Sequence, residues 1–241
     1  MIRSPVAALV LLGFLTPGSA EAKCARTEHR PKILTTRDTN IPDDGGVMVG
    51  WTSEVYSDED DHPVGDPSDQ PTWTATDGKK PVALARVSLA PGLSVYRPAH
   101  GTGKIIVKSK AGATLGTFAH DPKAAANTMA SPQVIGVALS TDKAMRWSER
   151  HAMTKLKVAP PVAAIALITY RVTAKGNEPI SFVTIADTHD TLTSLDAFQD
   201  AGHCGGVVGG SAPPNAGDKV VFAWVDAFGR LSPVSAPVTA K

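Results

Sequence analysis

The sequence predicts an all-β protein, on three observations. Gly and Pro together make 40 of the 241 residues, about 17% against roughly 12% in average usage, so turns are frequent. Most apolar runs are short, rich in β-branched residues and bounded by turn residues, which is typical of strands. No stretch carries the apolar period of a long helix. The chain is therefore expected to fold as packed β-sheets.

The first half of the chain predicts a series of strands separated by turn signals. Asp43-Asp44-Gly45-Gly46, Asp77-Gly78 and Pro91-Gly92 are dipeptides or short runs that favour turns. The expected strands are residues 46–54, 72–76, 82–89, 93–97, 104–110 and 114–120. The last four are close enough together to form an antiparallel meander.

Residues 121–132 resemble a linker, because they hold Pro122, three alanines and Pro132. Beyond them the expected strands are residues 133–139, 163–173, 180–186, 220–226 and 236–240. Residues 140–157 leave a short helix and a polar strand equally open. Residues 194–201 predict a short helix, with Leu195 and Phe198 on one face and Gly202 at its end.

The C-terminal segment carries a family resemblance. Residues 221–229 (VFAWVDAFG), followed by Ser232, Ser235 and Pro237-Val238, resemble the closing hairpin of a fibronectin type III or related immunoglobulin-like domain. Residues 41–54 resemble the opening of bacterial immunoglobulin-like modules, apart from the acidic insertion that follows. The resemblance implies two immunoglobulin-like β-sandwich modules in tandem, residues 23–130 and 131–241, in preference to one larger sandwich. It implies nothing specific about function.

Residues 1–22 have the organisation of a secretory signal peptide. Arg3 precedes a ten-residue apolar run at residues 6–15, and Ala20-Glu21-Ala22 fits the small-x-small cleavage rule. An uncleaved anchor is the alternative, but ten residues are too few for a ~30 Å hydrocarbon core. No other stretch is long and apolar enough, so the mature chain is predicted to have no transmembrane segment. We therefore expect an exported protein, periplasmic, cell-surface or secreted, beginning at Lys23.

The chain has two cysteines, Cys24 and Cys204. In an exported protein these most simply form one disulfide, which would stabilise the fold by roughly 5 kcal/mol on the chain-entropy model. Free structural thiols, or a nucleophilic Cys204 beside His203, are the alternatives. A lipid anchor on Cys24 is disfavoured, because the charged Lys23 precedes it.

An acidic loop is the most distinctive local feature. Residues 57–69 hold six carboxylates, and hard oxygen ligands of this kind suit Ca²⁺. The candidate calcium ligands are Asp58, Asp60, Asp66 and Asp69, at positions one, three, nine and twelve of an EF-hand count. His62 and Pro63 break the EF-hand pattern, so the alternatives are a different calcium loop and a solvated loop.

The sequence predicts no catalytic constellation. The seven histidines show no H-x-H or H-x-x-x-H spacing, and there is no G-x-S-x-G motif. His120-Asp121 and His189-Asp190 could each pair a base with a carboxylate, which also arises by chance. Lys79, Lys80, Lys104, Lys108 and Lys110 make part of the first half basic, and lysines on edge strands usually block aggregation.

The formal net charge of +1 gives no electrostatic drive toward nucleic acid or anionic membranes. The sequence thus favours an exported, non-catalytic β-sandwich protein that binds, adheres or acts as a spacer at the bacterial envelope, with a protein or glycan as partner. The alternative is an exported hydrolase or metal-dependent enzyme whose site is assembled from distant residues.

Overall fold

The structure, a computed structural model, describes residues 26–36, 39–56, 73–98, 103–109, 112, 114–121, 123, 128–144, 147–185, 194–200 and 213–241. These residues form strands and turns and no α-helix, which confirms the all-β prediction. The fifteen strands are β1 (Arg26–Ile33), β2 (Asn40–Ile41), β3 (Val47–Tyr56), β4 (Trp73–Thr76), β5 (Leu84–Ala90), β6 (Leu93–Pro98), β7 (Lys104–Ser109), β8 (Thr114–His120), β9 (Val134–Ala144), β10 (Trp147–Leu156), β11 (Ala164–Thr173), β12 (Gly176–Thr184), β13 (Ser194–Asp200), β14 (Lys219–Asp226) and β15 (Val238–Thr239). No helix in this part of the chain has the length and apolar character needed to cross a bilayer.

Four sheets are built from these strands. Sheet 1 has the order β2-β8-β7-β4, and sheet 2 has the order β1-β3-β6-β5. Sheet 3 has the order β12-β11-β14-β15, and sheet 4 has the order β13-β10-β9. Each sheet draws its strands from one side of residue 130, where the sequence places a boundary. The pairing is antiparallel except between β2 and β8.

The predicted turns define several hairpins as expected. β5 and β6 pair across Pro91-Gly92, where Gly92 has a φ of 75°, and β7 pairs with β8. The open alternative at residues 140–157 is settled in favour of strands, because β9 and β10 form a long hairpin.

The short helix predicted at residues 194–201 is wrong. These residues form β13, which pairs with β10 so that Leu195 lies opposite Thr154. Leu195 is fully buried in the core between sheets 3 and 4. Pairing with a strand distant in sequence therefore outweighs the local helical spacing.

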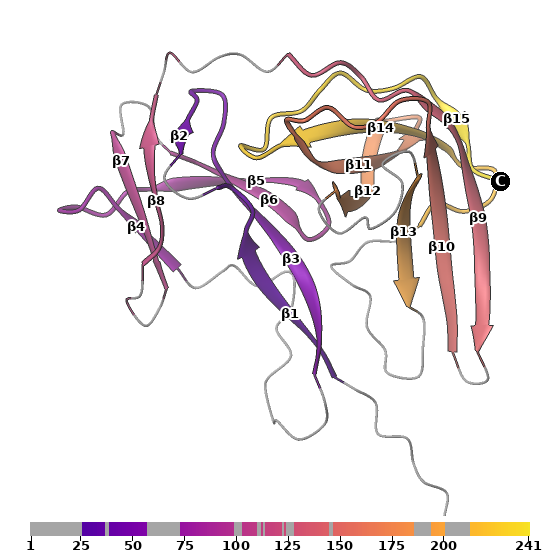
Figure 1. The fold of residues 1–241 in the computed structure, drawn as a ribbon, viewed down its shortest axis with the longest axis horizontal. Helices are drawn as coiled ribbons and strands as arrows, with labels where there is room; N and C mark the ends of the chain where they lie inside the picture. Colours follow the sequence, from indigo (N-terminus) through magenta and orange to yellow (C-terminus); the bar gives the residue numbers. More distant parts are fainter. Residues whose placement is uncertain are drawn as a thin grey trace, which may run out of the picture.

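The four sheets stack as layers in the order 1, 2, 3, 4, as Figure 1 shows from left to right. The core between sheets 1 and 2 includes Phe118 and Ile105, and the core between sheets 3 and 4 includes Phe222 and Trp224. A third, middle core lies between sheets 2 and 3. Its fully buried members come from both halves of the chain: Met48, Leu93 and Val95 from sheet 2, and Ala166, Ile168 and Val225 from sheet 3.

Sheets 2 and 3 are therefore apolar on both faces. In β14, Phe222 and Trp224 face sheet 4, while Val225 faces sheet 2. In β3, Val47 and Val49 face sheet 1, while Met48 faces sheet 3. This alternation follows from the two-residue period of a strand. It makes the middle core a direct continuation of the two outer ones.

The turn after β14 fastens the two halves together. Gly46 N donates to Phe228 O at 2.9 Å, and Thr35 Oγ1 donates to Ala227 O at 2.7 Å. Thr35 Oγ1 also accepts a hydrogen bond from Met48 N at 2.7 Å, so this hydroxyl links β3 to the turn after β14. These bonds hold sheets 2 and 3 at a fixed register.

A carboxylate holds this turn in shape. Asp226 is 3% exposed, and its Oδ1 accepts from the backbone N of Phe228 and of Arg230, each at 2.9 Å. Its Oδ2 accepts from Arg230 Nε at 2.7 Å, and Arg230 Nη1 lies 3.5 Å from Asp44 Oδ1 in the other half. The turn is thus both folded on itself and tied to sheet 2.

Replacing Ile168 by Ala should destabilise the whole described fold in one transition. The side chain is fully buried in the middle core, and such truncations cost about 2–5 kcal/mol. Denaturant unfolding followed by tryptophan fluorescence and circular dichroism measures the change. The matched control is Val162→Ala, a fully exposed site that should stay within about 0.5 kcal/mol of wild type. Two separate transitions, only one of them shifted, would contradict a shared core.

Replacing Gly229 by Ala should push sheets 2 and 3 apart. Gly229 has a φ of 73°, and an added Cβ would lie 2.7 Å from Val95 Cβ in the middle core. Gly112 also has a positive φ, of 87°, but nothing lies near its Cβ position. Gly229→Ala should therefore cost about 1–3 kcal/mol more than Gly112→Ala, the excess being steric. If thermal unfolding showed the same loss of stability in the two variants, Gly229 would not lie as close to Val95 as the structure places it.

Candidate binding cleft

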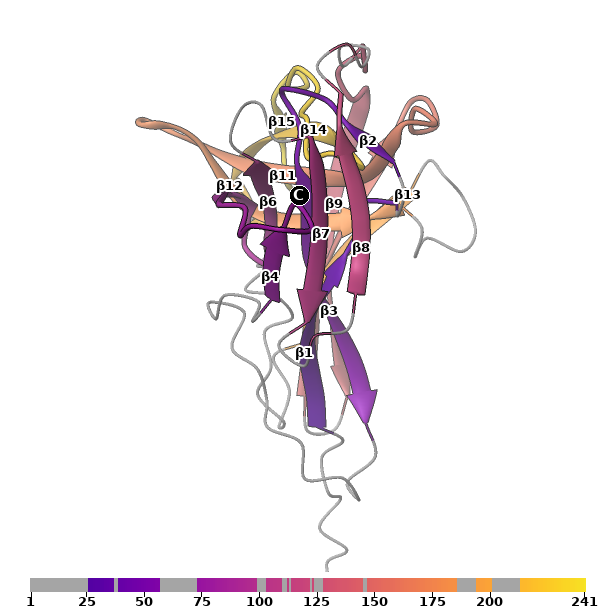
Figure 2. The ribbon, with the colours of Figure 1, turned by 90° about the vertical axis from the view of Figure 1, so that its left-hand side faces the viewer.

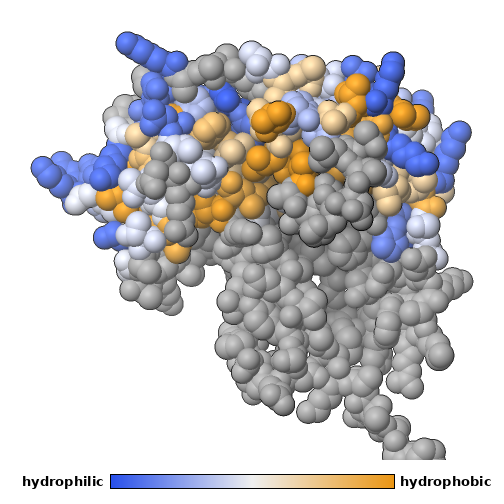
Figure 3. Space-filling view, viewed as in Figure 1, coloured by the Kyte–Doolittle hydropathy of each residue, from blue (hydrophilic) through white to orange (hydrophobic). Residues whose placement is uncertain are grey.

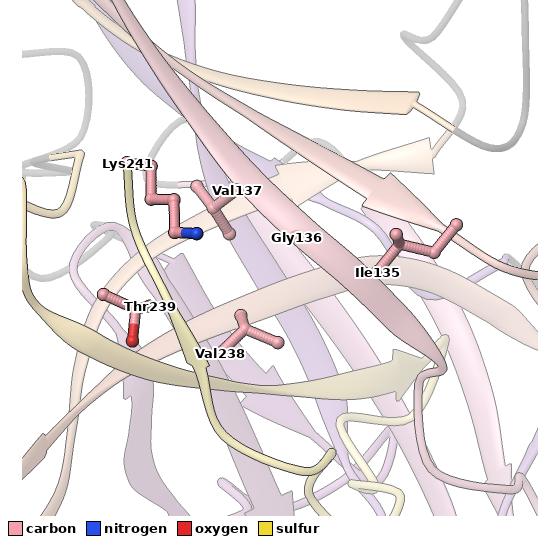
Figure 4. Close-up of a pocket in the computed structure, with 6 residues that line it drawn as sticks. All are labelled: Ile135, Gly136, Val137, Val238, Thr239 and Lys241. Carbon is pink, nitrogen blue, oxygen red and sulfur yellow. The ribbon is translucent and has the colours of Figure 1, made fainter.

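A surface cleft of about 410 Å³ opens at one edge of the second half of the chain. It lies between the beginning of β9 and the last residues of the chain, as Figure 4 shows. The lining residues are Ile135, Gly136, Val137, Val238, Thr239 and Lys241. The cleft thus sits where the first strand of sheet 4 meets the last strand of sheet 3.

The backbone on both sides of the cleft is held by parallel strand pairing. Val137 and Ala240 form a parallel bridge. Lys241 N donates to Val137 O at 3.1 Å, and Leu139 N donates to Lys241 O at 2.6 Å. The backbone groups of Val137 and Leu139 therefore close one end of the cleft and join sheet 4 to the end of sheet 3.

A turn before β14 clamps the other side of Ala240. Ala240 N donates to Asp218 O at 3.0 Å, and Gly217 N donates to Ala240 O at 2.9 Å. The Asp218 carboxylate holds the turn, because its Oδ2 accepts from Asn215 N at 2.8 Å and from Arg171 Nε at 3.0 Å. These hydrogen bonds, with the nearby guanidinium, lower the pKa of Asp218 from its usual value of 3.8.

The lining of the cleft is mixed, with apolar and polar surface in similar amounts. Val137 is 4% exposed and packs with Val238 on the outer core, while Ile135 is 67% exposed at the rim. An added Cβ at Gly136 would meet nothing within 4 Å, so this position leaves the cleft open. Thr239 and Lys241 supply a hydroxyl and an ammonium group. The lining set offers apolar contact and hydrogen bonding, and it contains no carboxylate side chain and no imidazole.

The candidate calcium ligands Asp58, Asp60, Asp66 and Asp69 lie outside the described residues, and so do Cys24 and Cys204. The calcium loop and the disulfide therefore stay predictions. Within the residues that the structure describes, no three His, Cys, Asp or Glu side chains gather as they would around a metal ion.

His120 does not pair with Asp121, the neighbour with which it could have formed a base–carboxylate pair. His120 Nε2 lies 2.7 Å from Asp43 Oδ1 instead, and its side chain is only 8% exposed. Asp121 Oδ1 accepts from Lys123 N at 2.9 Å. The neighbouring residue in a strand points to the opposite face, which separates His120 from Asp121. The second candidate pair, His189-Asp190, lies outside the described residues.

The sequence analysis did not identify the cleft. One signal was present, because Gly136 interrupts an apolar strand, and glycine inside a strand often marks a bulge or a place where another backbone approaches. The other half of the site depends on the pairing of the C-terminal residues 238–241 with β9, and no local sequence pattern predicts a contact between segments so far apart in the chain.

No model of a known protein family matches the chain, and no curated protein matches it. The function has to be argued from the geometry of the molecule itself.

Acid should weaken the clamp around Ala240. Because the pKa of Asp218 is lower in the folded chain, its stabilising contribution is present above its ordinary value of 3.8 and is lost as the pH falls through the folded value. Asp218→Asn should therefore be less stable than wild type at pH 7 and more nearly equal to it below pH 3. Unfolding midpoints across this range measure the effect.

Arg171→Gln provides an internal comparison for the same clamp. It removes one of the two donors to the Asp218 carboxylate, so it should reduce the acid dependence in part. An Asp218→Asn variant with the same pH dependence as wild type would show that this carboxylate has no such role.

Proposed function

We propose that the chain is an exported, non-catalytic module that binds a partner at the bacterial envelope. The observation that carries this proposal is the cleft of mixed apolar and polar lining between β9 and the C-terminal residues, set on a stack of four sheets that share a middle core. A fixed frame with an exposed apolar rim is suited to recognition, because little flexibility is lost when a partner binds. The sequence analysis supplies the export, through its predicted signal peptide at residues 1–22.

Strand order supports the immunoglobulin-like part of the proposal. Constant-type immunoglobulin domains place strands A, B, E and D in one sheet and C, F and G in the other. With β1, β3, β5 and β6 as A, B, D and E, sheet 2 has that order. With β4, β7 and β8 as C, F and G, sheet 1 also has it, and β2 adds alongside β8.

The second half supports a variant of the same plan. With β9, β10 and β13 as strands A, B and E, sheet 4 is a three-stranded sheet in the order E-B-A. β12 joins the sheet of β11, β14 and β15 and so takes the place of an added C′ strand. Sandwiches of this kind serve many unrelated functions, so binding has to be argued from the cleft.

The shared middle core supports rigid presentation of the cleft. Contacts between domains of one chain are usually polar and permit relative motion. Here Met48 and Val95 from one half bury fully against Ile168 and Val225 from the other. The distance from the cleft to the far end of the molecule is therefore fixed, which a spacer or adhesion module needs.

The cleft favours an extended protein segment as its partner. Ile135 and Val238 offer apolar contact to a single side chain, and Thr239 and Lys241 offer polar groups beside it. Recognition of extended peptides commonly combines a pocket for one side chain with strand edges for the backbone. The cleft supplies such a pocket, whereas the edge of β9 at Val137 and Leu139 is already paired with Ala240 and Lys241, so recognition depends on the side chains of the pocket.

Filling the cleft should abolish partner binding without unfolding the protein. Gly136→Leu places a side chain where nothing lies within 4 Å, and the matched control Gly103→Leu does the same at an exposed glycine in the other half. A photoreactive residue at position 135 should cross-link one stoichiometric partner in the native envelope. The purified partner should then bind wild type and Gly103→Leu alike, and Gly136→Leu at least tenfold more weakly.

Cross-linking from position 135 has its own control at Val162, which is even more exposed than Ile135 but distant in sequence from the cleft residues. A chain that yields no partner from position 135 would overturn the proposed function. So would a partner that binds Gly136→Leu as tightly as wild type.

A further inference from the structure

The outer face of sheet 1 is a second surface, at the opposite end of the stack from sheet 4. Figure 2 looks onto this end, with β4, β7 and β8 as the nearest layer. Paired residues lie side by side on one face of a sheet, so the pairing defines which side chains share it. Because Ile105, Val107 and Phe118 face the core, the outward rows are Thr74-Lys108-Thr114, Thr76-Ile106-Thr117 and Lys104-Ala119-Asn40.

This face combines lysines with hydroxyl groups. It carries Lys104 and Lys108 together with four threonines, and among these outward residues there is no carboxylate. Ile106 and Ala119 add small apolar areas between the polar rows. Figure 3 shows hydrophilic side chains at the left-hand end of the molecule, where sheet 1 lies, as well as along its top and at its right-hand end.

The prediction that these lysines guard a sheet edge is wrong for Lys104 and Lys108. Both belong to β7, which lies between β8 and β4 in the interior of sheet 1. A lysine on a central strand leaves the unpaired backbone groups of the edges untouched, so protection against edge-to-edge pairing does not account for them. Their common feature is that they project from the same open face, four residues apart.

Two further lysines extend the same surface. The turn at residues 77–80 lies over Ile106, because a Cβ at Gly78 would be 3.8 Å from Ile106 Cδ1. This turn carries Lys79 and Lys80. Its one carboxylate, Asp77, accepts hydrogen bonds from the backbone N of both lysines at 2.7 Å, and these bonds lower the pKa of Asp77. The surface thus has four lysines and one neighbouring aspartate, whose carboxylate is already hydrogen-bonded to the backbone of its own turn.

The whole chain has a formal net charge of only +1, so the four lysines mark a local concentration of positive charge. A linear polyanion would complement it along the strands, since residues four apart in a strand are about 13 Å apart. Threonine hydroxyls can exchange hydrogen bonds with sugar hydroxyls, and Ile106 and Ala119 can contact the apolar faces of sugar rings. No aromatic side chain is among the outward residues, which disfavours stacked nucleotide bases.

We propose that the outer face of sheet 1, with Lys79, Lys80, Lys104 and Lys108, binds a linear anionic polysaccharide. The proposal rests on the proposed function in so far as export brings the chain to the polysaccharides of the envelope. It adds a binding surface separate from the cleft, and it names the chemical class of the ligand that this second surface binds. Binding is electrostatic with hydrogen bonds from the threonines, so it weakens as salt concentration rises.

The test measures binding of the purified protein to polygalacturonate, with uncharged dextran as the reference polymer, at several NaCl concentrations between 50 and 200 mM. Wild type should bind polygalacturonate, bind dextran far more weakly, and lose affinity with salt. The variant K104Q/K108Q should bind at least tenfold more weakly at low salt. Its salt slope should fall by about one for each lysine removed.

The matched control is K155Q/K157Q, which removes the same charge from two exposed lysines of the second half. It should stay within twofold of wild type, and thermal unfolding should show that both variants are folded. Equal losses in the two double variants would overturn the proposal, because they would reflect net charge alone. Equal binding of dextran and polygalacturonate, or no binding of either, would also overturn it.

Two further measurements separate this proposal from others. Binding to phosphatidylglycerol vesicles but not to polygalacturonate would replace it with a membrane-surface role. Gly136→Leu should keep the full affinity for polygalacturonate, because the cleft lies at the other end of the stack. A negative result for polysaccharide binding by sheet 1 would therefore not contradict the proposal of a partner at the cleft. A negative result at the cleft would likewise not contradict polysaccharide binding by sheet 1.

Discussion

The burial of sheet 2 against sheet 3 is the contact on which the rest of the molecule depends. Each of these sheets already has one face packed against an outer sheet, and the middle core uses the second face. Burying large aliphatic side chains contributes about 1.5–3 kcal/mol each, and Met48, Leu93, Val95, Ile168 and Val225 are all fully buried here. Without this contact, two extensive apolar surfaces would face water.

The polar turn after β14 gives that contact its register. Apolar packing tolerates small slips, whereas the bonds from Thr35 and Gly46 to the turn carbonyls require defined atoms to meet. Asp226 is buried, yet its oxygens are all engaged by backbone and guanidinium donors. A buried charge satisfied in this way specifies one arrangement more than it adds stability. The orientation of both candidate surfaces follows from it.

Local chemistry was sufficient for much of the fold. Turn residues such as Pro91-Gly92 and Asp77-Gly78 placed the strands around them correctly. The error at residues 194–200 has a different origin. The apolar Leu195 can be buried by a helix or by a strand, and only the pairing of these residues with β10 decides in favour of the strand. The middle core was also missed, although the unbroken apolar run of Val220–Val225 is what a strand buried on both faces requires. Neither candidate surface could be located before the pairing of distant strands was known.

Two sheets that are apolar on both sides also affect how the chain must acquire its structure. The first half would emerge first during synthesis, and it could complete sheets 1 and 2 by itself. It would then present the residues of the middle core, among them Met48 and Val95, to its surroundings until sheet 3 arrived. Exposed apolar surface in a partly folded chain promotes aggregation. The order of events therefore favours a chain kept unfolded, or held by a chaperone, until β14 has been synthesised.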